Sequence, residues 1–399
     1  MNVSEHSLDL PCSSKASVPG NQRWQGRFPY KESISLLDVN RPFNLAEGAS
    51  ADLTVGELFD LTDPEDFRRL KLGYATSAGS WALREEISSA CEVPPEHVIT
   101  TQGAALGYFL LALEVCRCGD EAVIATPCFP ASRDILLGAG VTVHEAKLLF
   151  ENSYQLDLNQ IAVYLSSKTK LVSIASPQNP SGIRTPRSVI EKLLVLMSKH
   201  SPEAYLFIDE TYREASYGDD DVAGSLASVH PRVVTSGSVS KALGAPGLRV
   251  GWLTVPDAGL RSRLLVAKMN TVFSGSIVDE ALAFALLRNK GNVLAIRRHL
   301  LADALEELTI WCESEHERIK WVLPDAGALC CLRLCDDVMD DAAVERFWAL
   351  LPDFDLQLGC GTWFGESRRV FRLGFGYLPA SYLRPALYAL SAALDAAMH

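Results

Sequence analysis

The segment from Val233 to Val255 places a lysine between two apolar, β-prone runs, Val233–Thr235 and Val250–Val255. Glycines and four polar side chains lie between these runs: Ser238, Ser240, Lys241 and Arg249. A lysine side chain is rarely buried unless it has a charge partner or a catalytic function. Apolar neighbours make a lysine easier to deprotonate, so it becomes a nucleophile that can hold a carbonyl cofactor as a Schiff base. The hydroxyl groups and the guanidinium would then bind a phosphate. The alternative is a solvated turn with no ligand.

Apolar strand-like runs alternate with helical patterns along the middle of the chain. The runs are Val98–Thr101, Val123–Thr126, Val141–Ala146, Leu171–Ser176 and Ala204–Ile208. This order predicts an α/β fold with a mostly parallel sheet flanked by helices. In such a sheet, polar residues just after the strands meet at one edge, where ligands bind.

Charge and composition exclude several classes of protein. The chain has 399 residues, 48% hydrophobic and 22% charged, with a net charge of −12. An acidic chain without a basic helix-turn-helix segment is not expected to bind nucleic acid. No apolar run reaches the length of a membrane span, and no secretory signal opens the chain. We therefore expect a soluble, cytoplasmic protein with a small-molecule ligand and no membrane partner.

The cysteines are scattered, and none has the paired spacing of a zinc site. We expect free thiols and no metal.

The motif Ser238-x-Ser240-Lys241-x-x-Gly244-x-Pro246-Gly247-x-Arg249-x-Gly251 resembles the cofactor-lysine signature of the pyridoxal-phosphate (PLP) aminotransferases of classes I and II. The resemblance covers about residues 30–396 and implies a fold-type-I enzyme with PLP on Lys241. It implies a large PLP-binding domain, 51–290, and a smaller α+β domain, 31–50 plus 291–399. Residues 1–30 have no periodicity and are expected to form a flexible arm.

Two further motifs imply phosphate contacts. The strand Val98–Thr101 is followed by a small-residue turn and a helix, whose N-terminal N–H groups can bind an anion. The family's turn binds the PLP phosphate here, so Gly103, Ala104 and Ala105 are candidates. The family's tyrosine, which reaches the cofactor of the neighbouring subunit, matches Tyr74, and this implies a homodimer. From the sequence alone, Tyr74 is interpreted as an ordinary half-buried aromatic, and only the resemblance gives it this role.

Four residues match family contacts to the PLP ring. Phe129 follows a strand and would stack on the pyridine. Asn179, in Asn-Pro-Ser-Gly, and Tyr212 would bind the phenolic oxygen, and Asp209 would pair with the pyridinium nitrogen. Without the resemblance, Phe129 is a core aromatic and Asn179 belongs to a turn.

Arg372 matches the arginine that binds the substrate α-carboxylate, and Gly48 and Asn179 are further substrate contacts that the resemblance implies. The alternative for Arg372 is an edge residue facing water. The implied reaction is amino transfer, with Lys241, Asp209 and Tyr212 as catalytic residues.

The segment Ala46–Leu58 also resembles the PLP-dependent cyclases related to capreomycidine synthase, which leaves a lyase or cyclase reaction open. Its acids Glu47 and Asp52 would meet a cationic substrate side chain or simply be solvated. A PLP-binding regulator and an unrelated α/β binding protein are the non-enzymatic alternatives.

Overall fold

The computed structural model describes residues 28, 38–39, 41–219 and 222–399. Most of the expected arm, 1–30, and residues 31–37 and 40 lie outside the described residues.

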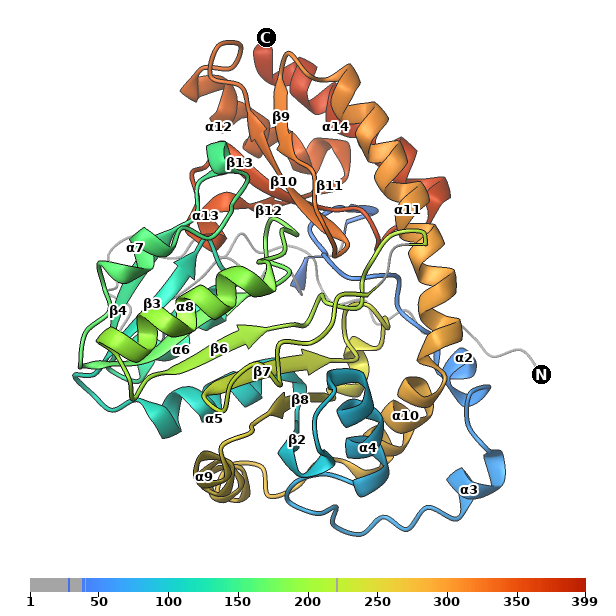
Figure 1. Cartoon of the computed structure of the whole chain (residues 1–399). Helices are drawn as coiled ribbons and strands as arrows, with labels where there is room; N and C mark the ends of the chain where they lie inside the picture. The colour runs from blue at the N-terminus through green and yellow to red at the C-terminus, as the bar shows by residue number, and fades with distance from the viewer. Residues whose placement is uncertain (1–27, 29–37, 40, 220–221) are drawn as a thin grey trace.

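A seven-stranded sheet forms the centre of the larger part of the molecule, with strand order β2-β8-β7-β6-β5-β3-β4 (Figure 1). Its strands are β2 (Val98–Thr101), β3 (Glu121–Thr126), β4 (Thr142–Lys147), β5 (Thr169–Ala175), β6 (Tyr205–Asp209), β7 (Val233–Ser238) and β8 (Gly251–Thr254). Within this sheet β8 alone runs antiparallel to its neighbours β2 and β7. The mostly parallel sheet expected from the sequence is confirmed.

Helices cover both faces of this sheet. Successive side chains of a strand point to opposite faces, so neighbouring residues pack against different helices. Val172 packs in a cluster with α8 (Arg187–His200) on one face, and the adjacent Leu171 packs with α5 (Gly103–Val115) on the other. The helices α6 (Pro130–Gly138) and α9 (Ala258–Met269) add to the α5 side, and α7 (Leu158–Ala162) adds to the α8 side.

A second, antiparallel sheet has the order β12-β13-β10-β9 and occupies the upper part of Figure 1. Its strands are β9 (Ile319–Val322), β10 (Leu329–Leu334), β12 (Gly359–Cys360) and β13 (Val370–Gly374). The helices α11 (Lys290–Ser314), α12 (Asp341–Leu350) and α14 (Ala380–Met398) contribute buried residues to the same core. The two-residue strand β1 (Phe43–Asn44) joins the N-terminal segment to β11 (Leu356–Gln357), while α13 (Gly361–Phe364) follows β12.

Two short helices lie in the N-terminal part of the described residues. The structure has α2 (Val55–Phe59) and α3 (Pro64–Arg68). Asp63 caps the second helix and Pro64 occupies its first turn, so a new helix begins there. Beyond them, α4 (Trp81–Cys91) packs on α10 (Ile277–Arg288).

The free thiols expected from the sequence are confirmed for the nine cysteines within the described residues, eight of which are buried. Within the same residues no helix has both the length and the apolar character needed to cross a bilayer.

Candidate active site

A cavity of about 360 Å³ opens at the carboxyl ends of the parallel strands. The strands β5, β6 and β7 run in the same direction, so the residues that follow them meet at this edge. Most of the side chains predicted from the sequence line the cavity: Gly103, Ala104, Ala105, Phe129, Asn179, Asp209, Tyr212, Ser238, Ser240, Lys241, Arg249 and Arg372. Residues as far apart in the chain as Glu47 and Arg372 therefore form one site.

One end of the cavity suits an anion. Helix α5 begins at Gly103, and no side chain caps its first N–H groups. Gly103 has φ +76°, and a Cβ atom there would lie 2.4 Å from Nη2 of Arg249. The left-handed φ favours glycine, and an added Cβ atom would also have to displace the guanidinium. The free N–H groups, the positive end of the helix dipole and Arg249 together make this end electropositive.

Lys241 lies in an ion pair instead of an apolar pocket. Its Nζ donates to Oε1 of Glu47 at 2.7 Å, and the two side chains are only 27% and 25% exposed. Burial lowers the pKa of Lys241, but Tyr212 and the Glu47 carboxylate outweigh this effect, so its pKa lies above its ordinary value. The sequence-based expectation of an easily deprotonated lysine is therefore wrong for the structure as it stands, because Glu47 stabilises the ammonium.

The same contact decides the environment of Glu47. Burial alone would raise its pKa, whereas the charge and hydrogen bond of Lys241 hold the pKa below its usual value. The interpretation of Glu47 as a solvated acid is wrong. Asp52 is exposed, and its pKa is raised by partial burial and by repulsion from Glu47.

Asp209 ends strand β6, and its side chain lies at the cavity wall. Its Oδ1 accepts hydrogen bonds from the hydroxyl of Ser236 at 2.8 Å and from both the backbone N–H and the hydroxyl of Thr211. The carboxylate is held firmly, and its other oxygen has no hydrogen-bond donor among the described residues.

Tyr212 is buried, yet its hydroxyl has no hydrogen-bond partner within the described part of the chain. An unsatisfied buried hydroxyl costs about 1–3 kcal/mol, so this group is a strong candidate to bind a ligand. Gly48 does not line the cavity and instead lies against this residue, since a Cβ atom there would be 3.2 Å from the Tyr212 hydroxyl.

Arg372 occupies the middle of β13, between β10 and β12, and is only 4% exposed. The alternative of an edge arginine facing water is therefore wrong. Its Nη1 donates to Oδ1 of Asn179 at 3.0 Å, its Nη2 donates to the Ala46 carbonyl, and the guanidinium lies over the Phe364 ring. Its buried Nε has no partner within the described residues.

Tyr74 lies outside the cavity and is 85% exposed, with its ring 5.0 Å from that of Phe273. The interpretation as a half-buried aromatic is wrong, because Tyr74 lies on an extended surface segment. Phe129, by contrast, is 40% exposed and contributes to the cavity wall.

Sequence reasoning missed Thr211 and Ser236 as site residues. Both lie beside recognised motif residues, and the parallel pairing of Asp209 with Ser236 brings the serine hydroxyl to the carboxylate. The place of Ser236 in the strand that leads to Ser238 and Lys241 is the signal that would have suggested it.

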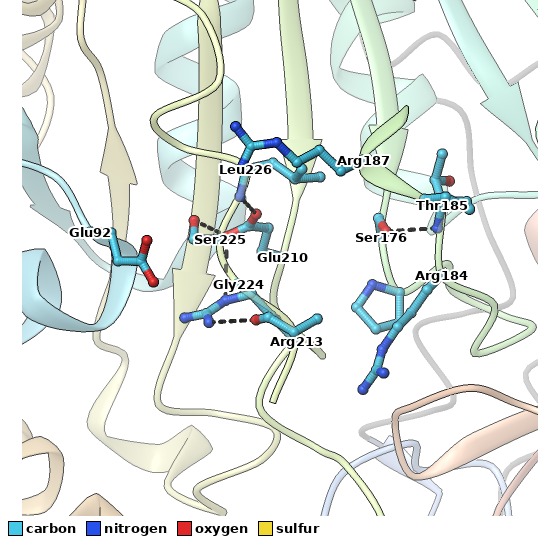
Figure 2. A pocket seen from close by; sticks show the side chains of 13 residues that line it. Glu92, Ser176, Arg184, Thr185, Arg187, Glu210, Arg213, Gly224, Ser225 and Leu226 are labelled. Atoms are coloured by element: carbon cyan, nitrogen blue, oxygen red, sulfur yellow. Dashed lines mark hydrogen bonds and ion pairs between the residues drawn. The ribbon is translucent and has the colours of Figure 1, made fainter. Parts of the chain in front are cut away.

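A second cavity, of about 320 Å³, lies beside the β6 carboxyl end and contains none of the predicted site residues (Figure 2). Its floor is a buried cluster in which Glu210 accepts hydrogen bonds from Ser225 and the Leu226 N–H and pairs with Arg213. No group of side chains that could hold a metal ion occurs among the described residues.

Comparison with known proteins gives the same family as the motifs. The sequence profile described as "Aminotransferase class I and II" matches residues 43–390. The chain is 29% identical to capreomycidine synthase of Streptomyces vinaceus over 349 residues, covering 85% of this chain and 86% of that protein. It is 26% identical to arginine–pyruvate transaminase AruH of Pseudomonas aeruginosa, covering 82% of each chain.

Solved structures of PLP-dependent enzymes have the same fold as this chain. A PLP-dependent aminotransferase from Streptococcus suis superposes with a TM-score of 0.84 at 26% identity, covering 93% of this chain and 99% of that one. The PLP-dependent cyclase OrfR shares the fold, with a TM-score of 0.81 at 22% identity over 95% of this chain and all of that one. The chain belongs to the class I and II aminotransferase family of PLP-dependent enzymes.

Proposed function

We propose that this enzyme transfers the amino group of an amino acid to a 2-oxo acid, with PLP bound to Lys241 in the 360 Å³ cavity. The observation that carries the proposal is the meeting of a lysine, an aspartate, an orphaned tyrosine hydroxyl and a buried arginine around one cavity: Lys241, Asp209, Tyr212 and Arg372.

The cavity residues fit PLP at both ends. The α5 N-terminus, Arg249, Ser238 and Ser240 suit the phosphate, and the absence of a Cβ atom at Gly103 leaves its N–H accessible. Asp209 at the opposite wall suits a protonated pyridine nitrogen. The orphaned Tyr212 hydroxyl and the Asn179 amide suit the phenolic oxygen, and Phe129 offers an aromatic face.

Each residue then has a distinct task in the reaction. The bound cofactor supplies an electron sink that stabilises negative charge at the substrate Cα. Asp209 keeps a proton on the pyridine nitrogen, which maintains the pull on those electrons. Nζ of Lys241, once free of the cofactor, would be the base that removes and returns the proton at the substrate Cα. Arg372 binds the substrate α-carboxylate through its unpaired Nε and its η nitrogens.

Glu47 supports an amino acid with a cationic side chain as the substrate. Its carboxylate lines the cavity and is neutralised by the Lys241 ammonium. When Lys241 holds the cofactor, its nitrogen is no longer a free ammonium, so the Glu47 carboxylate is available to pair with a cationic group of the substrate. The curated relative AruH is named for arginine, which agrees with this reading.

A PLP-dependent lyase or cyclase is the second candidate. The observation that favours it is the 29% identity to capreomycidine synthase over 85% of this chain. Both candidates use the same cavity and differ in whether a side-chain substituent leaves or the amino group is transferred.

The two candidates are separated by incubating the PLP-loaded enzyme with cationic and neutral amino acids and no oxo acid, and counting products by mass spectrometry. A transaminase converts one equivalent per site and stops until an oxo acid is added. A lyase or cyclase continues to turn over. Repeated turnover without an oxo acid excludes amino transfer as the main reaction.

We further propose a cytoplasmic homodimer in which Tyr74 reaches the cofactor phosphate of the partner subunit. The exposed rings of Tyr74 and Phe273, whose centroids are 5.0 Å apart, form an apolar pair on the surface that supports this arrangement. The buried free thiols support a reducing compartment. The separate sheets support a large domain of residues 51–290 and a small domain of residues 31–50 plus 291–399. Mixing inactive Lys241→Ala and Tyr74→Ala variants tests it, because a hybrid dimer contains one intact site. Failure of the mixture to regain activity contradicts the shared site.

A further inference from the structure

Asp209 is held by an unusual concentration of donors on one oxygen. The Ser236 hydroxyl, the Thr211 hydroxyl and the Thr211 N–H all donate to Oδ1. Ser236 is 1% exposed, so its hydroxyl is not available to water. Hydrogen bonds to an ionised group are roughly twice as strong as neutral ones, and together they fix the plane of the carboxylate.

The backbone on both sides of this carboxylate is equally constrained. The Asp209 carbonyl accepts from the N–H of Ser176 on the β5 side, and the Glu210 N–H donates to the Ser236 carbonyl on the β7 side. Thr211 follows Glu210, whose buried side chain is tied to Ser225 and Leu226, as Figure 2 shows. The donors of the carboxylate therefore belong to a rigid part of the fold.

We propose that Ser236 and Thr211 are positioning residues that direct the free Oδ2 of Asp209 toward the PLP ring nitrogen. This inference rests on the proposed function, in which Asp209 pairs with that nitrogen. Three donors on Oδ1 leave Oδ2 as the oxygen available to the pyridine nitrogen.

The test measures binding to the apoenzyme, so it does not depend on turnover. Dissociation constants are determined by fluorescence titration for PLP and for the analogue in which a CH group replaces the ring nitrogen. The ratio of the two constants reports the contact between the carboxylate and the ring nitrogen. Asp209→Asn gives the value of this ratio when that contact has lost its charge.

Ser236→Ala is expected to reduce the preference for PLP by about tenfold to thirtyfold, the lower part of the range for one hydrogen bond to a charged group. The affinity for the analogue stays the same, because the analogue makes no ion pair with Asp209. Ser236→Thr keeps a hydroxyl and restores the preference. The matched control is Ser216→Ala, which removes a buried hydroxyl that has no partner in the described part of the chain.

If Ser236→Ala weakens the binding of PLP and of the analogue equally, or weakens neither, the ratio of the two constants is unchanged. Ser236 then has a merely structural role, and the proposal is overturned. If Ser236→Ala does not fold, Thr211→Val makes the same test from the other donor. A wild-type protein that binds PLP without preferring it over the analogue removes the ring-nitrogen role of Asp209 and this inference with it. A wild-type protein that binds neither compound refutes the proposed function itself.

Discussion

Replacing Glu47 by Gln removes a negative charge from the cavity while keeping the size of the side chain. The Glu47–Lys241 pair is 2.7 Å long and both side chains are about three-quarters buried. It is therefore stronger than an exposed ion pair, which contributes about 0–1 kcal/mol. A hydrogen bond to a charged group contributes about 1.5–3 kcal/mol. We take the lower part of this range for the Glu47 carboxylate, because the cavity is open to water, which weakens the interaction.

If the same carboxylate binds a cationic substrate, its loss lowers kcat/KM for that substrate by about tenfold to thirtyfold. The assay compares arginine with citrulline, whose urea group has nearly the same shape without the charge. Glu47→Gln is expected to reduce the arginine/citrulline ratio by that factor with little change for citrulline. PLP saturation of each variant is confirmed by its absorbance.

Asp52→Asn is the matched control. Asp52 also belongs to the N-terminal segment but is exposed, so its removal changes the ratio by less than about threefold. An arginine/citrulline ratio that is the same in wild type and Glu47→Gln refutes the assignment of Glu47 to the substrate side chain. Equal losses for both substrates would place Glu47 in the common chemistry instead.

Three further predictions concern the remaining groups. Lys241→Ala abolishes turnover and leaves the circular dichroism spectrum unchanged, and borohydride fixes PLP to Lys241 in the wild-type protein only, as peptide mapping would show. Arg372→Lys keeps the charge but loses the planar donor set, so KM for the amino acid rises about tenfold; an unchanged KM would remove Arg372 from carboxylate binding. Lys268 is fully buried, and burial lowers its pKa to about 8. The unfolded chain binds its proton more tightly, so this residue lets stability rise by up to roughly 3 kcal/mol between pH 8 and 10.5. Lys268→Met flattens that rise in urea unfolding, whereas Met at the exposed Lys199 does not; equal slopes in wild type and Lys268→Met contradict the argument.

The sequence by itself determined the sheet and most of the cavity wall. Strands buried on both faces appear as continuous apolar runs, and the residues after parallel strands must meet at one edge. Asp209 and Asn179 could therefore be assigned from local motifs, as could the turn at Gly103. Each needs only a strand end and the few residues that follow it.

Contacts between distant segments were decided only by the tertiary structure. Glu47 and Lys241 are 194 positions apart, and no local pattern indicates that they pair. Their pairing reversed the expected direction of the lysine pKa, because a carboxylate 2.7 Å away outweighs burial. Likewise, the register of β6 against β7 brought Ser236 to Asp209, and the central place of β13 buried Arg372. Charge pairing and hydrogen bonding depend on distances of a few ångströms, which only the packing of these segments sets.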